Sequence, residues 1–98
     1  MYRSLGGVFL LYTFLERIIE ADTAANQTCL VPSDSQIISV RENLGRLVLT
    51  FLANPNENAN TLRTFKVCTQ SSVVLADNLD YVGSGVVDSE IYYILELL

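Results

Sequence analysis

The chain has 98 residues, of which half are apolar and 17% are charged, and its formal net charge is −5 at neutral pH. This length suits one compact globular domain, and the composition excludes a disordered or low-complexity segment. We therefore predict a single domain over residues 1–98.

The negative charge is confined to the last third of the chain. Residues 1–67 contain as many bases as acids, whereas the remainder contains five acids and no base. These acids are Asp77, Asp80, Asp88, Glu90 and Glu96. Because phosphate contacts require Lys or Arg, we expect no nucleic-acid partner. A basic protein partner is compatible with this charge, although acidity alone commonly serves only solubility.

The most apolar stretch is GGVFLLYTFLERIIEAD, residues 6–22, for which three interpretations compete. A membrane-spanning helix needs about 20 apolar residues, whereas this run reaches only roughly ten before Glu16. A secretion signal has a basic start, an apolar core and a small-residue cleavage site. Here two glutamates and an arginine separate the apolar core from the nearest small residues, which is wrong for a cleavage region.

The third interpretation is an amphipathic helix, and the spacing favours it. Apolar residues lie on one side of a 3.6-residue period at Val8, Leu11, Leu15, Ile18 and Ile19. Polar residues lie on the other side at Thr13, Glu16, Arg17 and Glu20. Phe9 falls on this polar side, and we expect it to contact a partner. A structural helix here favours a soluble, cytoplasmic location slightly over secretion.

The central part of the chain reads as strands and loops. QIISV at 36–40 is a short strand followed by the turn RENLG. In GRLVLTFLA, Leu47, Leu49, Phe51 and Ala53 alternate with polar residues, and in TLRTFKVCT Phe65 and Val67 alternate with Thr64 and Lys66. The loop NPNENAN lies between these two runs, so we predict that they form a hairpin. SSVVLA is a further short strand, and DNLDYVGSG is predicted to be a turn region.

The final segment, VVDSEIYYILELL at 86–98, is compatible with a strand or a helix, and its β-branched and aromatic content favours a strand. In a strand, Ile91, Tyr93, Leu95 and Leu97 would face the core. Tyr92 and Ile94 would then share the other face with Glu90 and Glu96. Such a face indicates either a surface covered by a partner chain or a central strand buried on both sides.

These elements predict an α+β fold, with a long N-terminal amphipathic helix packed on a four- to five-stranded antiparallel sheet.

The residue types present exclude several kinds of active site. The chain has no histidine, so no imidazole is available as a catalytic base or metal ligand. Two cysteines are too few for a zinc site of four protein ligands without histidine. The GSG at 83–85 lacks the continuation of a phosphate-binding loop, and the segment around it lacks the glutamate of a calcium loop. We predict no enzymatic activity, no metal site and no cofactor.

Two covalent features depend on the compartment. In an oxidising compartment Cys29 and Cys68 would form a disulfide, stabilising the fold by a few kcal/mol, and in the cytosol they would stay free. The triplet NQT at Asn26 matches a glycosylation site, but such triplets are frequent by chance.

A small acidic domain without catalytic groups is typical of a binding function. Our first hypothesis is a protein-interaction or assembly module, such as an adaptor, chaperone or complex subunit, that forms oligomers. The alternative is an exported effector, inhibitor or ligand-binding domain stabilised by the disulfide. A third hypothesis is a carrier that holds a small molecule or lipid between the helix and the sheet.

Overall fold

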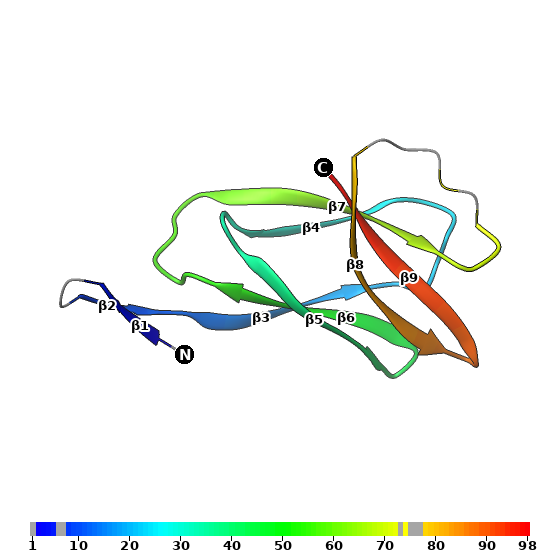
Figure 1. Cartoon of the computed structure of the whole chain (residues 1–98), viewed down its shortest axis with the longest axis horizontal. Coiled ribbons are helices and arrows are strands. Elements are labelled where there is room, and N and C mark those ends of the chain that lie inside the picture. The colour runs from blue at the N-terminus through cyan, green and yellow to red at the C-terminus, as the bar shows by residue number, and fades with distance from the viewer. Residues whose placement is uncertain (1, 6–7, 73, 75–77) are drawn as a thin grey trace.

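The computed structural model describes residues 2–5, 8–72, 74 and 78–98, and the side chains of those from residue 11 onward (Figure 1). The described part consists of strands and their connections, without a helix. The nine strands are β1 (Tyr2–Leu5), β2 (Val8–Leu11), β3 (Thr13–Ile19), β4 (Gln27–Pro32), β5 (Gln36–Asn43), β6 (Arg46–Ala53), β7 (Asn60–Cys68), β8 (Leu79–Val87) and β9 (Glu90–Leu97).

Seven of these strands form two antiparallel sheets with a common core. The smaller sheet has the order β3–β6–β5 and the larger sheet has the order β4–β7–β9–β8, while β1 and β2 form a separate ribbon. The ribbon lies at the end of the molecule marked N in Figure 1. The buried core contains side chains of both sheets: Ile19, Leu47, Leu49 and Phe51 from the smaller, and Cys29, Val31, Phe65, Val67, Val87 and Ile94 from the larger.

The predicted N-terminal helix is wrong. Residues 13–19 form β3, which pairs with β6 along its whole length. Leu15 and Ile19 lie on the core side of β3, whereas Phe14 and Ile18 lie on its outer side and are exposed. Because apolar residues occupy both faces of this strand, their spacing also fits a helical period. The fold of the described residues is therefore all-β, not α+β.

The two central strands form at the predicted places, but their predicted pairing is wrong. Between β3 and β5 lies β6, whereas β7 lies between β4 and β9 in the other sheet. The Asn-rich loop therefore crosses from one sheet to the other. A tight turn instead joins β6 to β5. Its central residues, Leu44 and Gly45, have φ values of 54° and 80°. Positive φ at both central residues is the geometry of a two-residue hairpin turn.

The C-terminal third also differs from the expectation in part. The final segment is a strand, as predicted, and β9 runs antiparallel to both β7 and β8. The predicted turn region over 77–85 instead supplies most of β8. The predicted strand 71–76 falls partly outside the described residues, and Ser71 and Ser72 form no strand. A second two-residue turn, Asp88–Ser89, joins β8 to β9 with φ values of 50° and 68°.

Hydrogen bonds from side chains to backbone groups join the two sheets along one edge of the sandwich. Gln27 of β4 accepts a hydrogen bond from the Glu20 N–H at 2.8 Å and donates one to the Glu20 carbonyl at 2.9 Å. Arg17 of β3 donates from Nε and Nη2 to the Leu30 carbonyl, both at 3.3 Å. These contacts satisfy backbone groups of the two edge strands, which would otherwise be free to pair with another chain.

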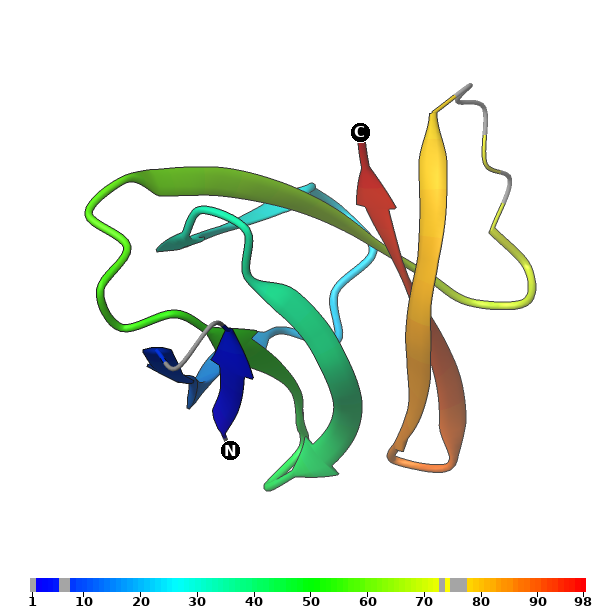
Figure 2. The same ribbon diagram turned by 60° about the vertical axis from the view of Figure 1, so that its left-hand side comes forward.

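On the opposite side the sheets approach closely because β8 carries glycines that face inward. A Cβ atom on Gly83 would lie 2.6 Å from Val40 Cγ2, and one on Gly85 would lie 2.5 Å from Leu47 Cδ2. Such distances are far below normal carbon contacts of about 3.5–4.0 Å. The GSG motif therefore allows β8 to lie against the smaller sheet (Figure 2).

Candidate interaction surface

The register of β9 determines which side chains leave the core. Ile94 is fully buried, and Tyr92 packs against the core from the same side. Tyr92, Ile94 and Glu96 therefore share one face of the strand, as predicted, but this face points into the sandwich. The other set, Ile91, Tyr93, Leu95 and Leu97, lies on the outer side, where water-facing groups were expected.

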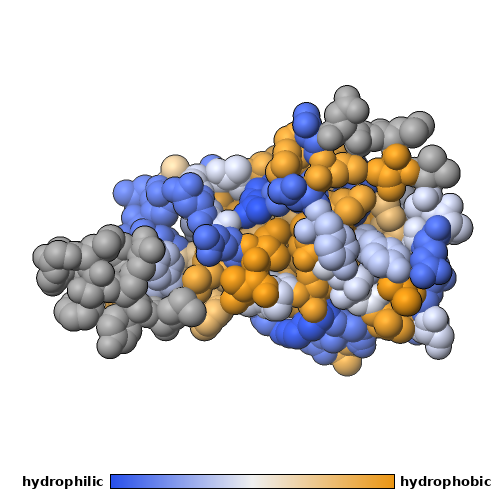
Figure 3. All heavy atoms as spheres, viewed as in Figure 1, coloured by the Kyte–Doolittle hydropathy of each residue, from blue (hydrophilic) through white to orange (hydrophobic). Residues whose placement is uncertain are grey.

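Outer side chains come from all four strands of the larger sheet, and Gln70, which follows β7, donates a hydrogen bond to the Tyr93 hydroxyl on this side at 3.3 Å. We call this surface the apolar face. Pairing across the strands places on it nine apolar side chains, Leu30, Leu62, Leu79, Tyr81, Val86, Ile91, Tyr93, Leu95 and Leu97, together with Thr28, Thr64, Lys66, Cys68 and Ser84. Tyr81 is 63% exposed and Leu62 61% exposed. Figure 3 shows further apolar surface where the two sheets meet, over the region in which β5 of the smaller sheet and β8 and β9 of the larger sheet lie in Figure 1. Several exposed apolar side chains on one side of a sheet are typical of interaction sites.

Carboxylates are turned away from the apolar face. In the register of β8 and β9, Asp80 and Glu96 stand opposite each other on the core side, and Glu90 stands opposite the buried Val87. Lys66 is therefore the one charged side chain among the described residues of the apolar face. The acidity of the last third of the chain lies mainly at the ends and on the inner side of the larger sheet.

A partly buried ion pair allows Glu96 to face inward. Arg63 donates to its carboxylate from Nε at 2.6 Å and from Nη2 at 2.7 Å. The third guanidinium nitrogen, Nη1, donates to the Ser35 carbonyl at 2.6 Å, and the Arg63 Cζ atom lies 5.4 Å from the centre of the Phe51 ring. The hydrogen bond to Glu96 raises the pKa of Arg63, which outweighs the effect of burial. A fully paired guanidinium and carboxylate avoid the cost of an isolated buried charge.

Two open hollows of about 440 and 410 Å³ flank this ion pair, and both include Ser35, Arg63 and Glu96 in their walls. Every guanidinium nitrogen already donates a hydrogen bond within the protein. The pair therefore serves the packing of the sandwich and offers no free cation to an anionic ligand.

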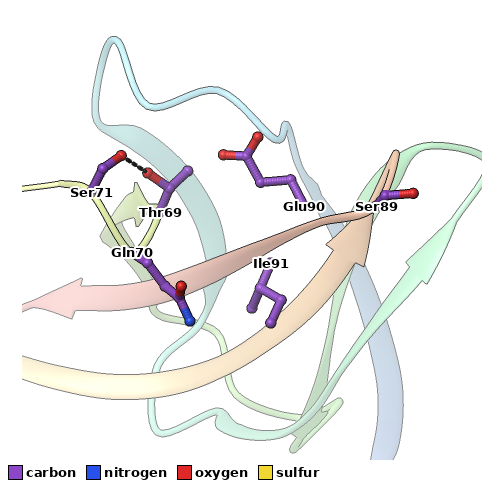
Figure 4. Close-up of a pocket in the computed structure, with 6 residues that line it drawn as sticks. All are labelled: Thr69, Gln70, Ser71, Ser89, Glu90 and Ile91. Atoms are coloured by element: carbon purple, nitrogen blue, oxygen red, sulfur yellow. Dashed lines mark hydrogen bonds between the residues drawn. The ribbon is translucent and has the colours of Figure 1, made fainter.

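A third hollow lies where β7 ends and β9 begins, as Figure 4 shows. It has a volume of about 310 Å³ and is lined by Thr69, Gln70, Ser71, Ser89, Glu90 and Ile91. Glu90 and Ile91 point to opposite sides of β9, so only Ile91 belongs to the apolar face. Thr69 and Ser71 hydrogen-bond to each other at 3.1 Å. This hollow therefore forms a polar end to the apolar face.

The outer side of the smaller sheet has a different character. It exposes Phe14 and Ile18, but Glu16 lies between them on the strand and forms an ion pair with Arg41. These charged groups interrupt the apolar surface. The two outer sides thus offer a comparison: Lys66 is the one charged side chain among the described residues of the apolar face, whereas an ion pair separates the apolar residues of the smaller sheet.

The cysteines lie on opposite sides of the larger sheet. Cys29 stands opposite Arg63 on the core side, whereas Cys68 stands opposite Tyr93 on the outer side, and both are buried free thiols. Five residues of β7 separate these positions, or roughly 17 Å of strand, whereas disulfide Cα atoms lie about 4.4–6.8 Å apart. Burial raises the pKa of the Cys29 thiol, although Arg17 and Arg63 partly oppose this.

The remaining candidate residues stay predictions. Phe9 lies on β2, outside the residues whose side chains are described. Asn26 is exposed immediately before β4. The gap between helix and sheet that a carrier would use is not formed, because the described part has no helix. Among the described residues, His, Cys, Asp and Glu form no group of three or more that could hold a metal ion.

The apolar face was not predicted from the sequence. Tyr93 and Leu95 were predicted for the core, and Tyr81 fell in a predicted turn. The usable signal was the run from Ile91 to Leu95, in which every residue is apolar or aromatic, since such a strand places apolar groups on both faces of a sheet.

The described part of the chain contains no helix of the length and apolar character needed to cross a membrane. Comparison with protein-family models, with curated proteins and with solved structures finds no match to this chain.

Proposed function

We propose that this chain is a non-enzymatic protein-interaction or assembly module that binds through the apolar face and forms oligomers. The observation that carries this proposal is the exposure of aliphatic and aromatic side chains across all four strands of the larger sheet. Burying such a surface stabilises a complex by about 25 cal/mol for each Å² of apolar area removed from water.

The arrangement of polar groups supports the same function. The apolar face has an uncharged centre apart from Lys66, while Glu90 and Asp88 lie exposed at the end of the β8–β9 hairpin. An apolar centre with polar groups at its margin is the usual anatomy of a protein interface.

Site-specific photocrosslinking tests this function. A photoreactive phenylalanine analogue is introduced at Tyr81 of the full chain, and a matched variant carries it at Phe14 on the outer side of the smaller sheet. Both positions are exposed aromatic residues, at 63% and 57%. In cells that express the chain, we expect a discrete protein adduct from position 81 and none from position 14.

A control separates specific binding from random collision. Val86 lies on the apolar face beside Ile91, and a Val86→Lys substitution places a charge there without touching position 81. This substitution should abolish the adduct formed at position 81. Equal labelling at both positions, or an adduct that survives Val86→Lys, contradicts an interaction function for this face.

A further inference from the structure

We infer that the turn Thr69–Ser72, which follows β7, is a releasable latch over part of the apolar face, and that the partner binds this face after the latch has opened. This inference rests on the proposed function and adds its regulation. We call the turn the latch turn. The observation that carries the inference is the hydrogen bond of 3.3 Å from Gln70 Nε2 to the hydroxyl of Tyr93, a residue of the apolar face.

The order of the strands brings the chain onto this side of the sheet. The strands β7 and β8 flank β9 and are both antiparallel to it, so they run parallel to each other. Parallel neighbours of this kind need a connection that crosses a face of the sheet, and here it must pass over β9. Because Tyr93 lies on the outer side and bonds to Gln70, the crossing begins on the outer side.

The latch turn reverses the chain directly after β7. The Ser72 N–H donates to the Thr69 carbonyl at 3.1 Å, and the Thr69 N–H donates to the Ser72 hydroxyl at 2.9 Å. Both bonds lie within the turn. Among the described residues, the bond from Gln70 to Tyr93 is the one side-chain hydrogen bond that ties the turn to the sheet. The turn can therefore keep its own shape while it moves away from the sheet.

Cys68 lies beside the latch turn and serves as a probe of its opening. Its side chain is on the outer side opposite Tyr93, yet the residue is only 4% exposed. The pairing of β4 with β7 reaches only as far as Phe65, so Cys68 has a paired strand on one side alone, that of β9. The latch turn begins at the next residue and is the adjacent segment. We expect its opening to uncover the thiol.

The closed latch turn and the partner compete for the same area. Gln70 and Ile91 line one hollow (Figure 4), and Val86 stands opposite Ile91 on the neighbouring strand. Val86 is 54% exposed and Ile91 is 40% exposed. A partner that covers these two side chains reaches the turn, so the equilibrium between the closed and the open turn limits its affinity. A substitution that opens the turn should therefore raise the affinity.

Thiol labelling of the full, natural chain measures the opening. A maleimide reacts with a cysteine while its thiol is uncovered, and cleavage after Lys and Arg places Cys29 in residues 18–41 and Cys68 in residues 67–98 for mass spectrometry. The two thiols are similarly buried, but Cys29 lies in the core. Each rate is divided by that of the same thiol in the urea-unfolded chain. Because local opening needs less free energy than global unfolding, Cys68 should then react at least about tenfold faster than Cys29.

Two substitutions remove the latch bond from its two ends. Gln70→Ala deletes the donor, and Tyr93→Phe deletes the accepting hydroxyl while it keeps the ring. Each should speed the labelling of Cys68 by about two- to tenfold, the effect of one hydrogen bond, and leave that of Cys29 unchanged. The double variant should match the single ones, because all three lack the same bond.

Gln36→Ala is the matched control for Gln70→Ala. Gln36 is an exposed glutamine on β5 whose side chain forms no hydrogen bond with the described residues. Its truncation should leave both labelling rates unchanged. The photocrosslinking assay at position 81 then connects the latch to the partner. Gln70→Ala should raise the yield of the adduct in cells, whereas Gln36→Ala should not.

The outcomes separate this inference from the proposed function. Equal normalised rates for Cys68 and Cys29 overturn the latch, and so does labelling of Cys68 that is insensitive to Gln70→Ala and Tyr93→Phe. Faster labelling with an unchanged adduct yield overturns the competition with the partner. An absence of adduct in every variant refutes the proposed function and the competition together. Labelling of Cys29 also verifies the fold, since global unfolding exposes both thiols, and Tyr93→Phe provides a second variant if Gln70→Ala unfolds.

Discussion

Replacing Gly83 by alanine tests whether the approach of β8 to the smaller sheet depends on a missing side chain. The new Cβ atom would lie 2.6 Å from Val40 Cγ2 and 3.1 Å from Val40 Cβ. A normal contact of about 3.5 Å requires a retreat of roughly 1 Å. Because valine branches at Cβ and is stiff at χ1, part of this retreat must come from the backbone of β5.

The expected cost is that of overpacking, a decrease of about 1–3 kcal/mol in the free energy of unfolding. With Val40→Ala in the background, Cγ2 is gone and only the contact near 3.1 Å remains. Gly83→Ala should then cost less than about 0.5 kcal/mol, which gives a coupling energy of at least about 1 kcal/mol.

Gly45 provides the matched control. It has φ of 80°, and a Cβ atom added there would meet nothing within 4 Å, so Gly45→Ala costs backbone strain of about 1–2 kcal/mol and no clash. Urea denaturation of the four variants of the Gly83–Val40 cycle, and of Gly45→Ala with and without Val40→Ala, measures these effects. An equal cost of Gly83→Ala in both backgrounds would refute the argument from space, whereas Gly45→Ala should be insensitive to Val40.

Three further predictions concern charges, turns and pH. Glu96→Leu leaves Arg63 without its carboxylate and should lower the free energy of unfolding by about 3–5 kcal/mol, and adding Arg63→Met should restore most of this loss. Urea denaturation measures both variants, and a double variant as unstable as Glu96→Leu alone contradicts the reasoning. Leu44 is 92% exposed with positive φ, so Leu44→Asn should raise the midpoint of unfolding by the equivalent of about 0.5–1 kcal/mol. A lower midpoint would contradict a hairpin turn with positive φ at both central residues. Because the pKa of Cys29 is raised in the folded state, the thiol stabilises the fold below the ordinary thiol pKa of about 8.5, and this contribution is lost as the pH rises above it. Denaturation at increasing pH should therefore show a steeper loss for the natural chain than for Cys29→Ala, and parallel curves would exclude this linkage.

Local pattern was sufficient to predict several strands but not their partners. The alternation of Leu47, Leu49 and Phe51 correctly indicated one buried face of β6. Pairing depends on which distant strands complete each sheet, and an Asn-rich loop closes a hairpin or crosses between sheets with equal ease. The hairpin of β5 and β6 had a weak signal, because Leu44 occupies a position where Asn or Asp is usual.

The phase of β9 could not be read from the sequence for a specific reason. A glutamate normally marks the solvent side of a strand, and this rule placed Tyr93 and Leu95 in the core. Glu96 violates the rule because Arg63, on another strand, pairs with it inside the sandwich. One long-range ion pair therefore inverts the faces assigned to the whole strand, since a shift of one residue moves every side chain to the other face.

The same inversion links the charge of the chain to its proposed function. When Glu96 and Asp80 stand on the core side of the larger sheet, alternation leaves Leu95, Leu97 and Tyr81 on the outer side. The carboxylates that make the chain acidic, and that would favour solubility, are therefore absent from the apolar face. A net charge of −5 and a nearly uncharged apolar face are compatible because the position of each charge, set by the register of two strands, decides what a partner meets.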